Sequence, residues 1–284
     1  MIVKKGALYL VGTPLGNLED MSPRAQFILR ECDFIAAEDT RVTAKLLSVF
    51  NIKKPLISYY EHNIRERGEE ICARLEKNEC CALVTDAGMP AISDPGEDIV
   101  RLCGERGIEV FAVPGPSAVV TALALSGLPT GRFTFEGFLT KAHKNRMQHL
   151  NDIKEETRTM VFYEAPHKLK ETLRDLYDTL GDRKISIARE MTKLHEEVIR
   201  TTLSQAIQIY EEKPPKGEFV LVIDGMPKKA PEHPDLNDIS LKDKLIADID
   251  MNIKLGLPKN AAVKKTADTF NLSRNEVYKI CFTD

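Results

Sequence analysis

The 284-residue chain lacks several features that would place it in common functional classes. No apolar run is long enough to span a membrane, and the first run, broken by Gly12 and Pro14, is too short for a signal-peptide core. The formal net charge of −3 provides no overall attraction for nucleic acid, although a local basic patch can still supply one. We therefore expect a soluble, cytoplasmic protein that does not associate with membranes.

Cysteine pairs and the common catalytic motifs are also missing. The six cysteines form no CxxC pair and mostly stand in apolar runs, which predicts buried free thiols in a reducing compartment. The phosphate-binding patterns GxGxxG and GxxxxGK[ST] are absent, as is the metalloprotease pattern HExxH. His195, Glu196 and Glu197 form the nearest metal-like cluster, but adjacent side chains point in different directions, so we expect no metal site.

The sequence does contain a repeated order of short apolar runs, turns and helical patterns. Each of the first four runs ends in a turn-forming cluster, and the runs occupy residues 7–11, 33–37, 80–84 and 108–113. Segments with apolar residues at helical spacing lie between these runs. In residues 22–32, for example, Ser22 can cap the helix and Pro23 suits its first position. This order predicts a parallel α/β layer, in which ligands gather at the carboxyl ends of the strands.

Changes of pattern along the chain predict its domains. We expect an α/β domain at 1–127, a second α/β domain at 128–226 whose strands can pair antiparallel, a proline- and charge-rich linker at 227–240, and a small helical domain at 241–284. The last domain is helical in pattern, and its later part has the pattern of two short helices joined by a turn. Ser273 and Glu276 are predicted to form a capping box on the second of them.

Three loops rich in glycine and proline, GTPLGN, DAGMPAISDPG and PGPSA, follow strands of the first domain. Glycine lets a ligand approach the backbone closely, and proline fixes the shape of the loop in advance. A tight turn between a strand and a helix needs the same residues, so one such loop alone is ambiguous. Three of them at one edge of a sheet favour a binding site for a small molecule.

Longer motifs surround these loops, in the order GTPLGNLEDMSPRA, AAEDTR, SYYEHN, TDAGMPAISDPG, VPGPSA, FEGF, FYEAPHKL, ARE with TKLHEE, and GEFVLVI. With these motifs, residues 7–284 resemble the ribosomal RNA small subunit methyltransferase I family, a branch of the tetrapyrrole methylase superfamily of class III methyltransferases. One departure is Met89, where the family usually has threonine before the proline. A position that contacts its ligand through the backbone tolerates this change.

The resemblance implies a fold and an activity. The fold is two α/β domains of the tetrapyrrole methylase type with a cleft between them, plus a small helical C-terminal domain, and the protein works as a homodimer. The activity is 2′-O-methylation of a cytidine ribose in the decoding region of 16S rRNA, in the 30S subunit, with S-adenosylmethionine as the methyl donor. No metal is needed, because the leaving group departs neutral.

The same resemblance implies the residues that contact the methyl donor. They lie in the three loops and at the strand ends of the second domain. The implied contacts are Pro14, Asp86, Ala87, Gly88, Ile92, Ser117, Ala118, Phe162, Tyr163, Ala188, Gly217 and Glu218.

Charged residues of the motifs are candidates for the chemistry. A ribose hydroxyl is a poor nucleophile and benefits from a base or a nearby cation. We hypothesise that a carboxylate such as Glu38 or Asp39, or else His62, assists deprotonation. The candidates for holding RNA phosphates or the ribose are Arg41, Lys168, Arg189 and Lys193. In the alternative interpretation, a structural salt-bridge network joins Glu38, Arg41, Arg189 and Glu190.

Two basic segments predict further contact with RNA. One carries Lys141, Lys144 and Arg146, just past the first domain boundary, and the other carries Lys264 and Lys265 in the tail. A run of charge can also be no more than the solvated face of a helix.

Two other functions remain open from the sequence. A tetrapyrrole methylase would keep the donor site, but the basic segment at 141–149, the extra C-terminal domain and the EDTR and YYEHN motifs argue against it. A DNA-binding regulator with a ligand-sensing α/β part would need a tail that binds duplex DNA. The weak charge excess of the tail argues against that function, so we expect no DNA partner.

Overall fold

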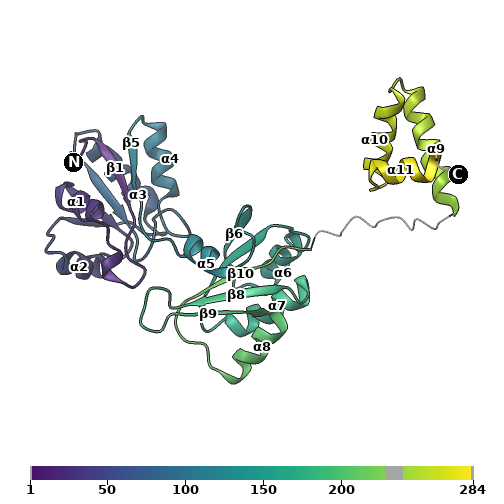
Figure 1. The fold of residues 1–284 in the computed structure, drawn as a ribbon. Coiled ribbons are helices and arrows are strands. Elements are labelled where there is room, and N and C mark those ends of the chain that lie inside the picture. The colour runs from purple at the N-terminus through teal and green to yellow at the C-terminus, as the bar shows by residue number, and fades with distance from the viewer. Residues whose placement is uncertain (1, 228–238, 283–284) are drawn as a thin grey trace. The chain divides into compact units, whose positions relative to one another are not determined.

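A computed structural model describes residues 2–227 and 239–282. The chain forms two compact units, Met1–Met226 and Pro227–Asp284 (Figure 1). The linker predicted at 227–240 falls, for residues 228–238, outside the described residues.

The first sheet of the larger unit has five parallel strands in the order β3-β2-β4-β1-β5. The strands are β1 (Ala7–Val11), β2 (Phe34–Ala37), β3 (Leu56–Ser58), β4 (Cys81–Val84) and β5 (Glu109–Val113). The parallel α/β layer predicted from the apolar runs is confirmed. Because all five strands run the same way, the loops after β1, β2, β4 and β5 meet at one edge of the sheet.

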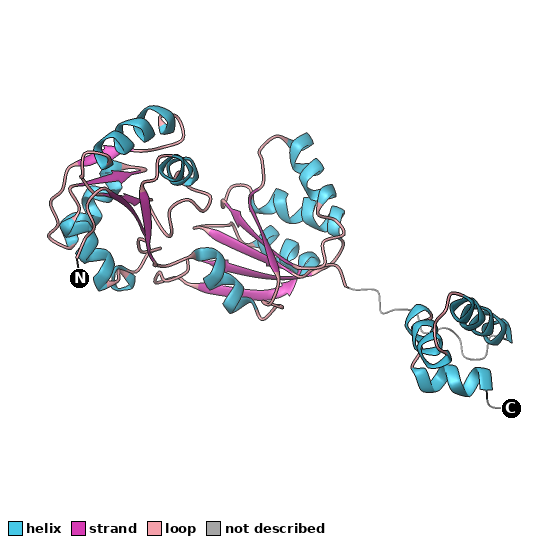
Figure 2. Ribbon diagram, turned by 90° about the horizontal axis from the view of Figure 1, so that it is seen from above, coloured by secondary structure: helices cyan, strands magenta, loops and turns pink. Residues whose placement is uncertain are grey.

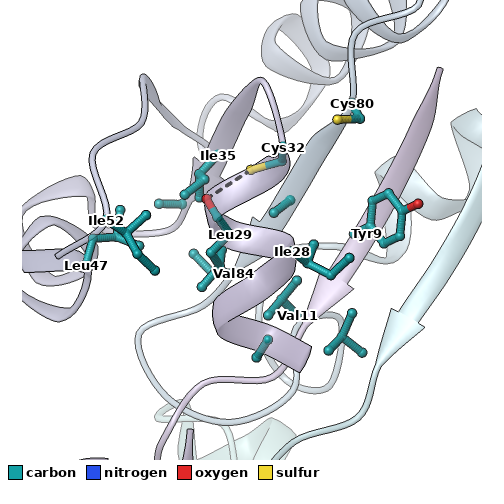
Figure 3. Close-up of a cluster of buried hydrophobic side chains, with 14 of the residues drawn as sticks. Tyr9, Val11, Ile28, Leu29, Cys32, Ile35, Leu47, Ile52, Cys80 and Val84 are labelled. Carbon is teal, nitrogen blue, oxygen red and sulfur yellow. Dashed lines mark hydrogen bonds between the residues drawn. The ribbon is translucent and has the colours of Figure 1, made fainter. Parts of the chain in front are cut away.

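Helices cover both faces of this sheet. On one face lie α1 (Pro23–Glu31) and α2 (Thr40–Val49), and on the other lie α3 (Ile64–Leu75) and α4 (Glu97–Glu105). Figure 3 shows the first of these cores, where Ile28 and Leu29 of α1 pack beside Val11, Ile35 and Val84 of the strands. A short 3₁₀ helix, η1 (Leu18–Asp20), precedes α1.

The local signals in the sequence account for these elements. The Ser22 Oγ accepts a hydrogen bond from the Ala25 amide at 3.0 Å, and Pro23 opens α1, as predicted. Strands β2 and β4 are buried along their whole length, which explains their continuous apolar sequence. All six cysteines are free and buried, which confirms the prediction of buried free thiols, and the Cys32 thiol donates to the Leu29 carbonyl (Figure 3).

The second sheet has the order β6-β7-β10-β8-β9 and is mixed. The strands are β6 (Phe133–Phe138), β7 (Thr159–Glu164), β8 (Lys184–Arg189), β9 (Glu197–Thr202) and β10 (Phe219–Ile223). Only β6 and β7 pair in parallel, and the remaining pairs are antiparallel, as the alternating patterns predicted. On one face pack α6 (His143–Asp152), α7 (Leu169–Leu180) and α8 (Leu203–Glu212), so that this sheet too lies against a layer of helices (Figure 2).

Helix α5 (Ala118–Ser126) joins the two sheets. It follows β5 of the first sheet, yet its residues Val119, Ala122 and Leu123 pack against Val161 and Val222 of the second sheet. Figure 1 shows this helix over β10. The helix lies within the range that the sequence assigns to the first domain, but it supplies the second layer of the second sheet.

The smaller unit contains three helices in its described part. They are α9 (Ile239–Lys254), α10 (Lys259–Thr269) and α11 (Arg274–Phe282), with a core of their own that includes Leu245, Val263 and Val277. The capping box predicted at α11 is confirmed. The Glu276 amide donates to the Ser273 Oγ at 3.2 Å, and the Ser273 amide donates to the Glu276 carboxylate at 2.7 Å.

Candidate functional site

The three glycine- and proline-rich loops pack directly on one another at the edge of the first sheet. Thr13 and Gly88 exchange two backbone hydrogen bonds, at 2.9 and 3.1 Å, and the Thr13 hydroxyl donates to the Thr85 carbonyl at 3.1 Å. A Cβ on Gly12 would lie 2.7 Å from the Gly115 Cα, closer than real Cβ contacts allow. Glycine is therefore required at 12 and 115 because the loops touch each other.

This packing changes the reason for the glycines. The sequence suggested that a bare backbone serves the ligand, whereas Gly12 and Gly115 serve contact between loops. Gly88 differs from them, because it has a φ of +87° and also lines a cavity. Backbone contacts between the loops therefore hold this edge together, and only part of the edge, including Gly88, lines the cavity.

A cavity of about 490 Å³ opens between this edge and the second sheet. Its walls come from the loops after β1, β2, β4 and β5, from the ends of β6 and β7, and from the start of β10. The lining residues are Leu15, Glu38, Asp86, Ala87, Gly88, Met89, Ile92, Asp94, Ser117, Ala118, Phe138, Tyr163, Glu164, Ala165, Pro166, Glu218, Phe219 and Val220. Both sheets therefore contribute to one site.

The charge of the lining is of one sign. Five of its side chains are acidic, namely Glu38, Asp86, Asp94, Glu164 and Glu218, and none of the lining residues is lysine, arginine or histidine. A cavity of this kind favours a ligand that carries positive charge and disfavours phosphates and carboxylates.

Partial burial and mutual repulsion raise the pKa values of three carboxyls of the cavity lining. Burial, with the nearby charges of Asp86 and Asp39, raises the pKa of Glu38, although the Asp86 amide donates to its carboxylate at 3.5 Å. Burial also raises the pKa of Asp86, whose carboxylate accepts from the Asp39 amide at 3.2 Å. Burial together with Glu38 and Asp86 raises the pKa of Asp94 to about 7.

The fold of the larger unit is similar to that of two solved enzymes. Uroporphyrin-III-C-methyltransferase from Thermus thermophilus has a TM-score of 0.56 at 18% identity, over 78% of this chain and 94% of that one. Diphthine synthase has a TM-score of 0.59 at 17% identity, over 77% of this chain and 90% of that one. At this identity the likeness establishes the fold alone.

Sequence relatives establish more. Residues 7–207 match the family of tetrapyrrole (corrin/porphyrin) methylases. The ribosomal RNA small subunit methyltransferase I of a Synechocystis strain is 46% identical over 276 residues, which cover 97% of each chain. The chain belongs to this methyltransferase family. The Thermotoga maritima member is 51% identical over 220 residues, which cover 78% of this chain and 99% of that one.

Family membership confirms the resemblance and the fold class given by the motifs. It also identifies the protein as an enzyme that transfers methyl groups. Family membership alone does not assign the individual site residues, whose positions come from the structure.

Most of the implied donor contacts lie on the cavity. Those that line it are Asp86, Ala87, Gly88, Ile92, Ser117, Ala118, Tyr163 and Glu218. Pro14 and Gly217 flank lining residues without lining the cavity themselves. Phe162 is fully buried in the core beneath α7 and α8, and Ala188 is buried against α5. Adjacent side chains of a strand face opposite sides, so Phe162 and Tyr163 cannot both face the cavity.

Several lining residues were not singled out from the sequence as donor contacts. Met89 and Asp94 belong to the loop that the motif already marked, and Glu164, Ala165 and Pro166 belong to the FYEAP motif. The motifs could therefore have identified them as whole segments. Phe138 closes the FEGF motif, so the same argument applies to it.

Among the catalytic candidates, only Glu38 lies on the cavity. Asp39 caps α2 by accepting from the Arg41 amide at 2.8 Å, and its carboxylate also pairs with the Arg41 guanidinium at 2.6 Å. The Arg41 side chain holds the pKa of Asp39 well below its usual range. His62 is exposed, packs edge-on against Tyr60, and lines a separate groove at the start of α3.

The salt-bridge network considered from the sequence is not formed as such among the described residues. Arg41 pairs with Asp39, and Arg189 pairs with Glu197 at 3.1 Å. Glu190 pairs with Lys193 at 3.0 Å, and that lysine also reaches Glu218 at 2.9 Å. These are separate local pairs, and Glu38 takes part in none of them.

Lys168 and Lys193 belong to the segments that connect elements of the second sheet and its helices. Lys168 is half-buried at the start of α7, directly after the FYEAP segment. The aliphatic stem of Lys193 covers Gly16 of the first loop, so closely that a Cβ on this glycine would clash with it. Lys193 therefore joins the two halves of the site, with its charge balanced by Glu190 and Glu218.

The predicted RNA contacts differ in exposure. Lys141 and Lys144 are exposed near the start of α6, and Lys264 and Lys265 are exposed on α10 of the smaller unit. Arg146 is not available in the same way. Only 5% of its side chain is exposed, and it pairs with Glu171 and, at 2.6 Å, with Asp175 of α7.

No group of three or more metal-ligating side chains occurs among residues 2–227 and 239–282. In the cluster at 195–197, Glu196 accepts from the Thr192 amide at 2.6 Å and Glu197 pairs with Arg189, which gives both carboxylates other partners. Over the same residues, no helix is long and apolar enough to cross a membrane.

Proposed function

We propose that this protein transfers a methyl group from S-adenosylmethionine to the ribose 2′-hydroxyl of a decoding-region cytidine in 16S rRNA, in the cavity between its two sheets. The observation that carries the proposal is that all charged residues lining this cavity are acidic, in a chain that belongs to this family. The relatives' name, ribosomal RNA small subunit methyltransferase I, supports the RNA substrate.

The charge of the cavity supports this donor over other nucleotides. S-Adenosylmethionine carries a sulfonium, an ammonium group and a single carboxylate, so its net charge is positive, whereas a nucleoside triphosphate carries several negative charges on its phosphates. Five acids, one of which (Glu218) is paired with Lys193, attract the former and repel the latter. The same lining opposes a tetrapyrrole acceptor, whose carboxylate side chains would meet these acids.

Different residues of the site bind the methyl donor and accept the proton of the ribose hydroxyl. Bound S-adenosylmethionine supplies the methyl group on a cationic sulfur. The loops after β1, β4 and β5 and the FYEAP segment of β7 hold this donor in one orientation, and fixed alignment of reacting atoms accounts for roughly 7–11 kcal/mol in favourable systems. Glu38, which lines the cavity and has a raised pKa, accepts the proton of the ribose hydroxyl.

Exposed lysines support binding of the RNA outside the cavity. Lys141 and Lys144 lie near the start of α6, and Lys264 and Lys265 lie on α10, where each is free to meet a phosphate. In this proposal Arg41, with its exposed guanidinium beside Asp39, and Arg189 and Lys168 serve the RNA rather than the donor. The resemblance further supports a homodimer that acts in the cytoplasm on the 30S subunit.

Calorimetry with a cavity-filling variant tests the donor site. The wild-type protein should bind S-adenosylmethionine and should not bind ATP at the same concentrations. Ala118→Trp places a large ring in the cavity and should abolish donor binding, while Ala124→Trp, at an exposed position of the same helix, should not. Failure of the wild-type protein to bind the donor, or binding of ATP in its place, would contradict the proposal.

A further inference from the structure

We propose that Asp94 is the residue by which the cavity distinguishes the cationic methyl donor from its demethylated product, by releasing a proton when the donor binds. This inference rests on the proposed function, because it concerns the ligands of that cavity. The product, S-adenosylhomocysteine, carries an uncharged thioether where the donor carries a sulfonium.

The geometry separates Asp94 from the other cavity acids. Glu38 accepts from the Asp86 amide, and Asp86 accepts from the Asp39 amide. Glu164 accepts from the Thr172 hydroxyl and from the Ala165 amide. Glu218 pairs with Lys193.

Asp94 has no such partner. Within the described part of the chain, no donor or cation meets its carboxyl group, although it lines the cavity and is half-buried. The rigid loop fixes its position, because Ser93 before it has a φ of +64° and Pro95 after it restricts its backbone. The carboxyl is therefore held at the cavity wall with its hydrogen-bonding capacity unused.

The charged groups that face Asp94 disfavour its ionisation. They are the carboxylates of Glu38, after β2, and Asp86, after β4. The hydroxyl of Tyr163 on β7 is a further titratable group near Asp94, and its own pKa is raised to about 12 by burial and by Asp94. Burial and the two carboxylates raise the pKa of Asp94 to about 7, so that before a ligand binds this group is about half protonated near neutral pH.

A cation in the cavity reverses this balance. The sulfonium favours the carboxylate form, so the O–H bond of the Asp94 carboxyl breaks and the proton passes to solvent as the donor binds. Since the group loses its proton on binding, donor affinity rises as the pH rises toward 7 and levels off above it. The product keeps the ammonium group but lacks the charge on sulfur, so its binding should follow pH much less.

Calorimetry with both ligands at pH 5.5 and 7.0 tests the inference. This range keeps the α-amino group of either ligand protonated, since such groups have an ordinary pKa of about 7.7–8.0. The dissociation constant of the donor should fall about tenfold between the two values, and that of the product less than about threefold. Measured in buffers of different ionisation enthalpy at pH 7.0, donor binding should release about half a proton per site.

Asp94→Asn should flatten the pH dependence of donor binding and reduce the preference for donor over product at pH 7.0 about tenfold. The matched control, Asp98→Asn, removes a carboxylate that is half exposed on α4 and should behave like the wild type. If Asp94→Asn does not fold, the wild-type comparison of the two ligands still decides.

Three results would overturn the inference. Donor and product could depend on pH to the same degree, the donor could bind equally at both pH values, or Asp94→Asn could keep the wild-type slope. In each of these cases the donor still binds, so the proposed function stands. Absence of donor binding at every pH would overturn both.

Discussion

At the scale of single residues, two features determine which side chains line the cavity. They are the alternation of side chains along each strand and the contacts between the loops. Tyr163 faces the cavity while its neighbour Phe162 lies under α7 and α8, because the two alternate across β7. Motifs of the sequence marked the right segments, and eight of the twelve implied donor residues lie on the cavity. A motif does not show which side chains of a strand face the cavity and which face the core. For this reason the motifs could not show that Phe162 and Ala188 lie in the core.

The two candidate bases, Glu38 and His62, can be separated by substitution. Glu38→Gln should slow single-turnover methylation about 100-fold at saturating donor, because it removes the proton acceptor on the cavity wall. His62→Ala, in a separate groove, should leave this rate unchanged and thereby serve as the control. A normal rate for Glu38→Gln together with a slow rate for His62→Ala would assign the proton to the histidine.

At the scale of secondary-structure elements, periodicity and capping signals predicted β1, β2, β4, β5, α1 and the last two helices of the chain. Ser22 and Pro23 at α1, and Ser273 with Glu276 at α11, fulfil their predicted roles because these contacts are local in sequence. The packing of α5 was not predictable in this way. Its sequence is apolar on most sides, so periodicity does not indicate which sheet it covers.

Helix α6 shows how a basic segment can hide a structural residue. Arg146→Ala should lower the free energy of unfolding by about 3 kcal/mol, because it leaves Asp175, which is largely buried, without its partner. Lys144→Ala, at an exposed position of the same helix, should leave the stability unchanged and weaken RNA binding. Chemical denaturation and filter binding with 16S rRNA fragments measure the two effects. Equal stability of both variants would show that Arg146 does not hold α6 to α7.

At the scale of the whole molecule, the cavity and the helical C-terminal unit are formed by different parts of the chain. All residues that line the cavity belong to Met1–Met226, and the core of the smaller unit contains none of them. The Thermotoga maritima relative is aligned over 220 residues that cover 99% of its length, which is too short to include both units. The sequence placed the change of composition near residue 227, because loss of apolar periodicity is visible without a structure.

A chain that ends at residue 226 tests this separation. It should fold and bind S-adenosylmethionine like the full-length protein, because it keeps both sheets and the whole cavity. Its affinity for the 30S subunit should fall about 100-fold, because linked binding modules reinforce each other. Calorimetry and sedimentation with 30S subunits measure the two quantities. Loss of donor binding in a folded, truncated chain would show that the C-terminal unit contributes to the cavity.

Methyl transfer to 16S rRNA is tested most directly by incubating the purified protein with isotopically labelled S-adenosylmethionine and 30S subunits from cells that lack the enzyme, and by mapping the label. We expect one 2′-O-methylated cytidine in the decoding region of 16S rRNA, with no transfer to a porphyrinoid offered in parallel. Label on a base, on the porphyrinoid, or on no acceptor at all would contradict it.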